Sequence, residues 1–136
     1  MIDEALQDHC LSDATLRRIL GDRIYPDFAP ASAAVPYVLR SRLSNPPHDH
    51  LAGEAAIASP TFQFTVVAAS NKQRNEVADA LRASLSRYSG PMGTDDVEVS
   101  SPEEADDIES AADGSERRLF VRRLDFEVWH SKEPAR

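Results

Sequence analysis

Two segments show the regular alternation of apolar and polar residues that is typical of half-buried β-strands. In residues 61–67, Phe62, Phe64 and Val66 stand at every second position, and Thr or Gln stands between them. Residues 119–129 follow the same rule, because Leu, Phe and Val alternate with charged residues toward the end of the segment. Both segments are therefore predicted to be strands that bury one face.

Two further strands are indicated by shorter patterns. Residues 37–43 are predicted to pair antiparallel with 61–67 across a long loop at 45–59, which is a candidate contact surface because structureless loops of that length are uncommon. The expected inner residues of this strand are Tyr37, Leu39 and Leu43, and the expected outer residues are Val38, Arg40 and Arg42. Residues 97–99 predict a short or edge strand, which ends at Pro102 because proline has no N–H for the ladder.

An apolar period near 3.6 residues predicts helices at the start and in the middle of the chain. Residues 2–20 are expected to form two helical pieces or one bent helix, with Ser12 or Asp13 capping the second piece and Gly21 as its left-handed end. The Pro-rich residues 23–36 are expected to be an extended crossover, because proline fixes φ and removes a donor.

The main helix is predicted to begin after Ser70. Ser70 and Gln73 have the spacing of a capping box, although Asn71 could cap instead, and Gly90 with Pro91 is expected to end the helix. The predicted buried stripe is Val77, Leu81, Leu85 and Tyr88, and the residues left for solvent are Lys72, Arg74, Glu76, Asp79, Arg82 and Arg87.

The order of these elements predicts a single α+β domain over residues 1–136. We expect one small mixed or antiparallel sheet of about four strands, with helices packed on one face. The polar residues 131–136 are expected to be a frayed tail.

Negative charge is concentrated in one part of the chain. The 136 residues carry 15 Lys and Arg and 23 Asp and Glu, a formal charge of -8. Ten of the acids and no base lie in residues 95–116, so the remainder holds 15 bases and 13 acids, a net of +2. We interpret this acidic variable segment as a solvated excursion, extended or mobile; the alternative is a surface that repels nucleic acid or meets a basic partner. Without a comparable basic cluster, no specific nucleic-acid binding is expected.

Motifs for catalysis are absent from the sequence. There is no glycine-rich phosphate loop, no nucleophile elbow, no HExxH and no CxxC, and Cys10 is the single cysteine. His48, Asp49 and His50 form a metal-like cluster, but zinc would need further ligands. We therefore expect no enzyme, no cofactor and no bound metal.

The sequence also argues against a membrane protein. No apolar run approaches the roughly 18 residues that a membrane-spanning helix needs. The first residues carry acids where a signal peptide would carry bases, so we expect synthesis inside the cell.

Three segments share their order and spacing with a known protein family. They are Leu20-Gly21-Asp22-Arg23-Ile24-Tyr25-Pro26 with the following stretch to Val38, Phe62-Gln63-Phe64-Thr65-Val66 through Leu81, and Arg117-Arg118-Leu119 to Trp129. In these segments the chain resembles the small tail-completion proteins of tailed phages, prophages and gene transfer agents. It departs from the family pattern in residues 95–116, where Pro102 interrupts a more regular strand.

The resemblance implies a structural protein of the virion tail with a small sheet flanked by helices. Such proteins are similar to tail terminators, which form a ring, commonly a hexamer, on the head-proximal end of the tail tube. The resemblance thus implies a protein that forms a homo-oligomer when assembled and contacts the tail tube protein and the head connector protein. Whether it is a monomer before assembly stays open. A small acidic adaptor that binds a protein partner is the alternative.

Eight residues are the candidate interface. They are His48, Asp49, His50, Asp106, Asp107, Glu109, Arg122 and Arg123. The arginines could steady the acidic segment by ion pairing or face a partner, and exposed pairs are worth about 0–1 kcal/mol each. If the protein forms a ring, the acidic segment is a candidate for the lumen, where it would repel DNA phosphate.

Overall fold

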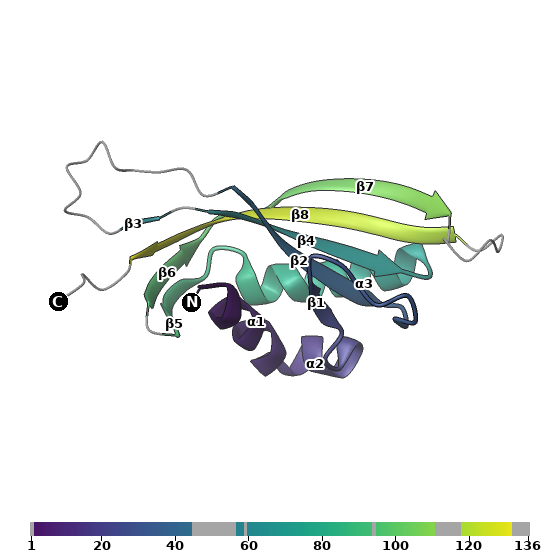
Figure 1. Cartoon of the computed structure of the whole chain (residues 1–136), viewed down its shortest axis with the longest axis horizontal. Coiled ribbons are helices and arrows are strands. Elements are labelled where there is room, and N and C mark those ends of the chain that lie inside the picture. The colour runs from purple at the N-terminus through teal and green to yellow at the C-terminus, as the bar shows by residue number, and fades with distance from the viewer. Residues whose placement is uncertain (1, 45–56, 59, 94, 111–117, 132–136) are drawn as a thin grey trace.

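A computed structural model describes residues 2–44, 57–58, 60–93, 95–110 and 118–131, and Figure 1 shows the chain. The helices are α1 (Ile2–Ser12), α2 (Ala14–Leu20) and α3 (Asn71–Leu85). The strands are β1 (Ile24–Pro26), β2 (Tyr37–Ser44), β3 (Ile57–Ala58), β4 (Thr61–Ala68), β5 (Ser89–Met92), β6 (Asp95–Val99), β7 (Glu103–Ser110) and β8 (Arg118–Ser131). The three helices lie on one side of a curled sheet (Figure 1).

The α+β class is confirmed, whereas the prediction of about four strands was wrong. The sheet has eight strand segments in the order β1-β2-β4-β8-β6-β5, and β3 and β7 also pair with β8. The sheet is mixed because β1 runs parallel to β2, and the other pairs are antiparallel. The added strands are short or charged, so they lack the apolar alternation that marks a strand in sequence.

The long strand β8 organises the whole sheet. One of its edges pairs with β4 and β3, and the other pairs with β7 and β6 (Figure 1). Between β6 and β7, three residues (100–102) lie opposite two residues of β8, which is a β-bulge. The Ser100 N–H donates to the Glu127 carbonyl and the Glu127 N–H donates to Ser100 Oγ, each at 2.9 Å. Pro102 therefore lies in a bulge within a longer strand.

The ends of α2 and α3 follow local capping chemistry. The Asp13 carboxylate accepts the N–H groups of Thr15 and Leu16 at 3.0 Å, and Gly21 has φ 63° at the other end of α2. Ser70 caps α3, since Ser70 Oγ accepts the Gln73 N–H at 3.1 Å. Two helical pieces and the Ser70 cap are thus confirmed.

The predicted end of α3 was wrong. The helix ends at Leu85, and Arg87 takes a φ of 60°, which turns the chain back into β5. Gly90 and Pro91 lie inside β5, which pairs only with β6 among the described strands. Proline is tolerated in an edge strand because its missing N–H faces away from the ladder.

The core lies between the helices and the facing side of the sheet. Phe64 and Phe126 meet edge to face in it, with ring centroids 5.7 Å apart. From α3, Val77, Leu81 and Leu85 are fully buried, as predicted, and Tyr88 packs against them partly buried. The prediction that Arg74 faces solvent was wrong, since it is 8% exposed.

The two faces of β2 are reversed from the prediction. Val38 is fully buried and Arg40 is 8% exposed on the helix side, whereas Leu43 is 54% exposed. The reason is α1, which supplies polar partners inside: Arg40 contacts Gln7 and Asp3, and Arg42 pairs with Asp3. Arginine can bury its stem when its charged head finds such partners.

Candidate interaction surface

The candidate interface residues of the sequence fall into two groups. His48, Asp49 and His50 lie outside the described residues. Asp106, Asp107 and Glu109 lie on β7, and the two arginines, Arg122 and Arg123, lie on β8 beside it. The structure thus brings these five together on adjacent strands, and their role as an interface stays a prediction.

Asp106 and Arg122 form the centre of this second group. They are register partners, and Arg122 donates from Nε to Asp106 Oδ1 at 2.6 Å and from NH2 to Oδ2 at 3.0 Å. This bidentate bond, with a smaller contribution from Arg74, lowers the pKa of Asp106 below its ordinary value. The ion pairing of the acidic segment by Arg122 is therefore confirmed.

Further ion pairs tie β7 to α3. Arg82 NH1 on α3 contacts Glu104 Oε1 at 2.5 Å, and Arg74 NH2 lies 3.6 Å from Asp106 Oδ2. On β8, Arg123 contacts Glu109 at 3.3 Å. The side chains of residues 103–109 are all exposed, so charge pairs and the backbone ladder, rather than burial, hold β7 in place.

Large apolar side chains are exposed at the sheet. Trp129 is 40% exposed, and Leu43, which lies at the irregularity of β2 between Arg42 and Ser44, is 54% exposed. The alternation of β8 places Trp129 on the side opposite the buried Val128. Trp129 is not among the eight interface residues predicted from the sequence. The signal that could have indicated it is a tryptophan at a strand position whose same-face neighbours are charged.

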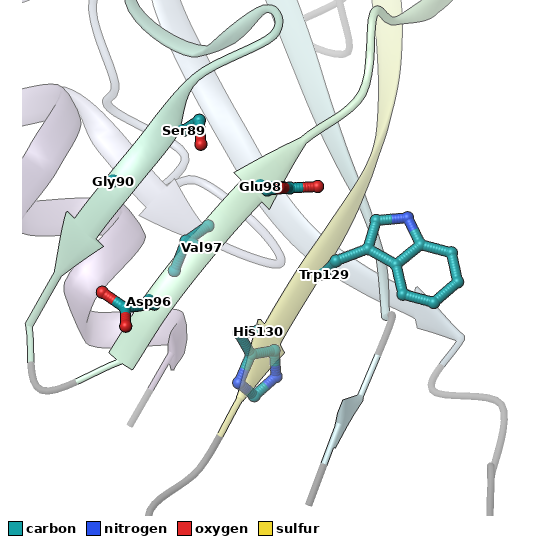
Figure 2. Close-up of a pocket in the computed structure, with 7 residues that line it drawn as sticks. All are labelled: Ser89, Gly90, Asp96, Val97, Glu98, Trp129 and His130. Carbon is teal, nitrogen blue, oxygen red and sulfur yellow. The ribbon is translucent and has the colours of Figure 1, made fainter. Parts of the chain in front are cut away.

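A groove of about 480 Å³ lies beside Trp129 (Figure 2). Its lining residues come from β5, β6 and β8: Ser89, Gly90, Asp96, Val97, Glu98, Trp129 and His130. We call it the Trp129 groove.

Acidic and aromatic side chains both line the Trp129 groove. Glu98 is the register partner of Trp129, and Figure 2 shows its side chain directed toward the side of β6 on which Trp129 lies. Asp96 and Glu98 are both exposed, while Val97 and His130 are buried and pair across the strands. An indole with a carboxylate beside it and a second carboxylate in the same groove can hold a cationic side chain, by a cation–π contact and by charge-assisted hydrogen bonds.

The thiol of the single cysteine is shielded from solvent. Cys10 is fully buried in the core, and this burial, with a contribution from Asp13, raises the pKa of its thiol to about 12. A thiol so protonated is a poor nucleophile.

Among the described residues, no three His, Cys, Asp or Glu side chains are grouped to hold a metal ion. No described helix has the length and apolar character to span a membrane.

Comparison with known proteins gives the family. The family model described as tail completion protein gp17 matches residues 4–131. The chain belongs to this family. Its fold agrees with a chain of the solved structure entitled "Virion of native gene transfer agent (GTA) particle", with a TM-score of 0.67 and 17% identity, over 96% of this chain and 98% of that one. No curated protein matches the chain in sequence.

Membership of the tail completion family makes the protein a structural component of a phage-like tail. The resemblance stated from the three sequence segments is thereby confirmed. In such a component, the surfaces that contact other subunits determine the function. The acidic strand β7 and the Trp129 groove are the two candidate surfaces of this chain.

Proposed function

We propose that this tail completion protein assembles as a ring of six copies on the head-proximal end of the tail tube. There it ends the tube and presents the surface to which the head connector joins. It acts as a structural part and not as an enzyme, and it works in the virion tail after synthesis in the host cytoplasm. The single observation that carries the proposal is the family match over residues 4–131.

Two features of the described chain support this role. The helices cover one side of the sheet, and on the opposite side Trp129 is 40% exposed, so this side can contribute to contacts with other subunits. The protein also carries different charges on different elements, with acids on β7 and exposed arginines on α2. A ring needs such unlike surfaces, because its subunits meet head to tail.

The acidic strand β7 is suited to a position near the passing DNA. Glu104, Asp106 and Glu109 are engaged by arginines, whereas Glu103 and Asp107 make no ion pair within the described residues. We therefore propose that the remaining charge of β7 faces the lumen and repels phosphate. Replacing Glu103 and Asp107 by Lys is expected to reduce DNA delivery without reducing particle number, and unchanged delivery would contradict the lumen position.

The test of the proposed function is electron microscopy of particles made without this gene, with the restored gene as the control. Overlong headless tubes are expected if the protein ends tube growth. Tubes of normal length that do not join filled heads would assign it the joining step alone. Normal particles would contradict both roles and favour a protein-binding adaptor.

A further inference from the structure

The Trp129 groove has the chemistry of a receptor for a cationic side chain. It combines a partly exposed indole with the exposed carboxylates of Asp96 and Glu98. Trp129 also lies on a central strand, since β8 is flanked there by β6 and β3. Partly exposed tryptophan in a concave site is the residue type that anchors protein contacts.

The same chain carries a matching cationic element. Arg17 and Arg18 lie next to each other in the last turn of α2, and both are exposed. Neither side chain makes an ion pair or a hydrogen bond within the described residues. By contrast, Arg122 and Arg123, the other adjacent arginines of the described chain, are engaged by Asp106 and Glu109.

These two surfaces lie on different parts of the molecule. In Figure 1, α1 lies between α2 and the β5–β6 pair. The α2 end of one copy can therefore approach the groove of a second copy while the second copy keeps its own α2 end exposed. A contact between two unlike surfaces of identical chains is heterologous and repeats from copy to copy, which closes a ring when the rotation allows.

We propose that the Trp129 groove of one copy receives the Arg17–Arg18 end of α2 from the next copy. The proposal rests on the proposed ring and names the contact that builds it. One arginine stacks on the indole of Trp129, and the guanidinium groups bond to the carboxylates of Glu98 and Asp96. Burial in the contact strengthens these bonds because it removes competing water.

Charge reversal across the contact tests the proposal. The variants Asp96→Lys/Glu98→Lys and Arg17→Glu/Arg18→Glu are each expected to lose the ability to restore tails in a strain that lacks the gene. The combination of all four changes is expected to restore tails, because each interface then again pairs opposite charges. Glu76→Lys and Lys72→Glu, on exposed positions of α3, are the matched controls and are expected to behave as wild type.

The outcomes separate the contact from the ring itself. If removal of the gene leaves tails unchanged, the proposed function fails. If removal abolishes tails but Asp96→Lys/Glu98→Lys and Arg17→Glu/Arg18→Glu both restore them fully, the function stands and the contact is wrong. The contact is also wrong if both variants fail and their combination fails while its thermal unfolding matches wild type.

Cross-linking gives a second measurement that does not depend on charge. A photoreactive phenylalanine at position 129 in assembled tails is expected to form cross-linked peptides that contain Arg17 or Arg18 of another copy. Cross-links to the tube protein, to the connector protein or to no protein would overturn the proposal. An identical probe at position 76 controls for random collisions.

Discussion

Asp106 of β7 and Arg122 of β8 stand directly opposite each other and share two hydrogen bonds, of 2.6 and 3.0 Å. Their strands differ in how they are held. Leu124, Phe126 and Val128 bury one side of β8 in the core, whereas no side chain of residues 103–109 is buried. We therefore expect loss of this pair to weaken the attachment of β7 to the sheet more than it weakens the fold as a whole.

The first prediction concerns the pH dependence of this pair. Arg122 lowers the pKa of Asp106 in the folded protein below the unfolded value of about 3.9. The stabilisation is thus fully present above the unfolded value and is lost as the pH falls through the folded pKa. Asp106→Asn is expected to lower the free energy of unfolding by about 0.5–1 kcal/mol near neutral pH, because the carboxylate is partly exposed and screened.

Urea unfolding of wild type and Asp106→Asn between neutral and acidic pH checks this expectation. The difference between the two proteins is expected to shrink as the pH falls below about 4, because the carboxyl becomes protonated first in the unfolded state and, at lower pH, in the folded state. Amide exchange in β7 is expected to be faster in the variant at neutral pH. Glu76→Gln is the control, and a difference of constant size at every pH would contradict the mechanism.

The strands that sequence could predict are those whose pattern comes from burial. The alternation of β4 and the end of β8 follows from one buried face, and the stripe of α3 follows from the same cause. β7 could not be predicted in this way, because its side chains are exposed and its partners are arginines distant in sequence, such as Arg82. Like-charged residues indicate a solvated segment unless the neighbouring cations are known.

The faces of β2 and the Trp129 groove were missed for a related reason. Arg40 and Arg42 read as outward residues until α1 brings Asp3 and Gln7 to the inner side of the sheet. The groove exists only when β5, β6 and β8 lie side by side. Contacts between distant segments determine both features, and the local pattern contains neither.

The second prediction concerns the buried Arg74 of α3. Its NH2 group donates to Asn71 Oδ1 at 2.6 Å, and its guanidinium carbon lies 5.6 Å from the centre of the Phe120 ring. NH1 also approaches the carbonyl oxygens of Asp107 on β7 and Val121 on β8 at 3.4 Å, so the side chain joins α3 to these two strands. Arg74→Ala is expected to lower the free energy of unfolding by about 1–3 kcal/mol, because these acceptors lose a charged donor.

Arg74→Lys is expected to recover only part of this loss, because an ammonium cannot reproduce the planar fork of the guanidinium. The measurement is the urea midpoint of each variant. Lys72→Ala, two residues away on the exposed side of α3, is expected to change the free energy of unfolding by no more than about 0.5 kcal/mol. Equal values for Arg74→Ala and Lys72→Ala would show that Arg74 does not connect the strands.

The third prediction tests the reversed faces of β2. Asp3 of α1 pairs with Arg42 and lies 3.7 Å from NH1 of the buried Arg40. Asp3→Asn is expected to lower the free energy of unfolding by about 1–2 kcal/mol, because it leaves the Arg40 charge without a carboxylate in a mostly buried site. Glu4→Gln is the control, since Glu4 is exposed in the same first turn and shares the helix-dipole effect. Equal effects at both positions would mean that only the dipole matters.

The fourth prediction uses Cys10 as a reporter of unfolding. The thiol is fully buried and its pKa is raised to about 12, so both access and thiolate formation are suppressed in the native protein. A thiol reagent such as DTNB is expected to label Cys10 only in molecules that have unfolded, and the labelling rate is expected to rise with urea in step with the unfolding transition. A Glu76→Cys variant in a Cys10→Ala background is the control and is expected to react at once without urea. Equally rapid labelling of native Cys10 would show that the α1 side of the core opens readily, and would reopen a chemical role for this thiol.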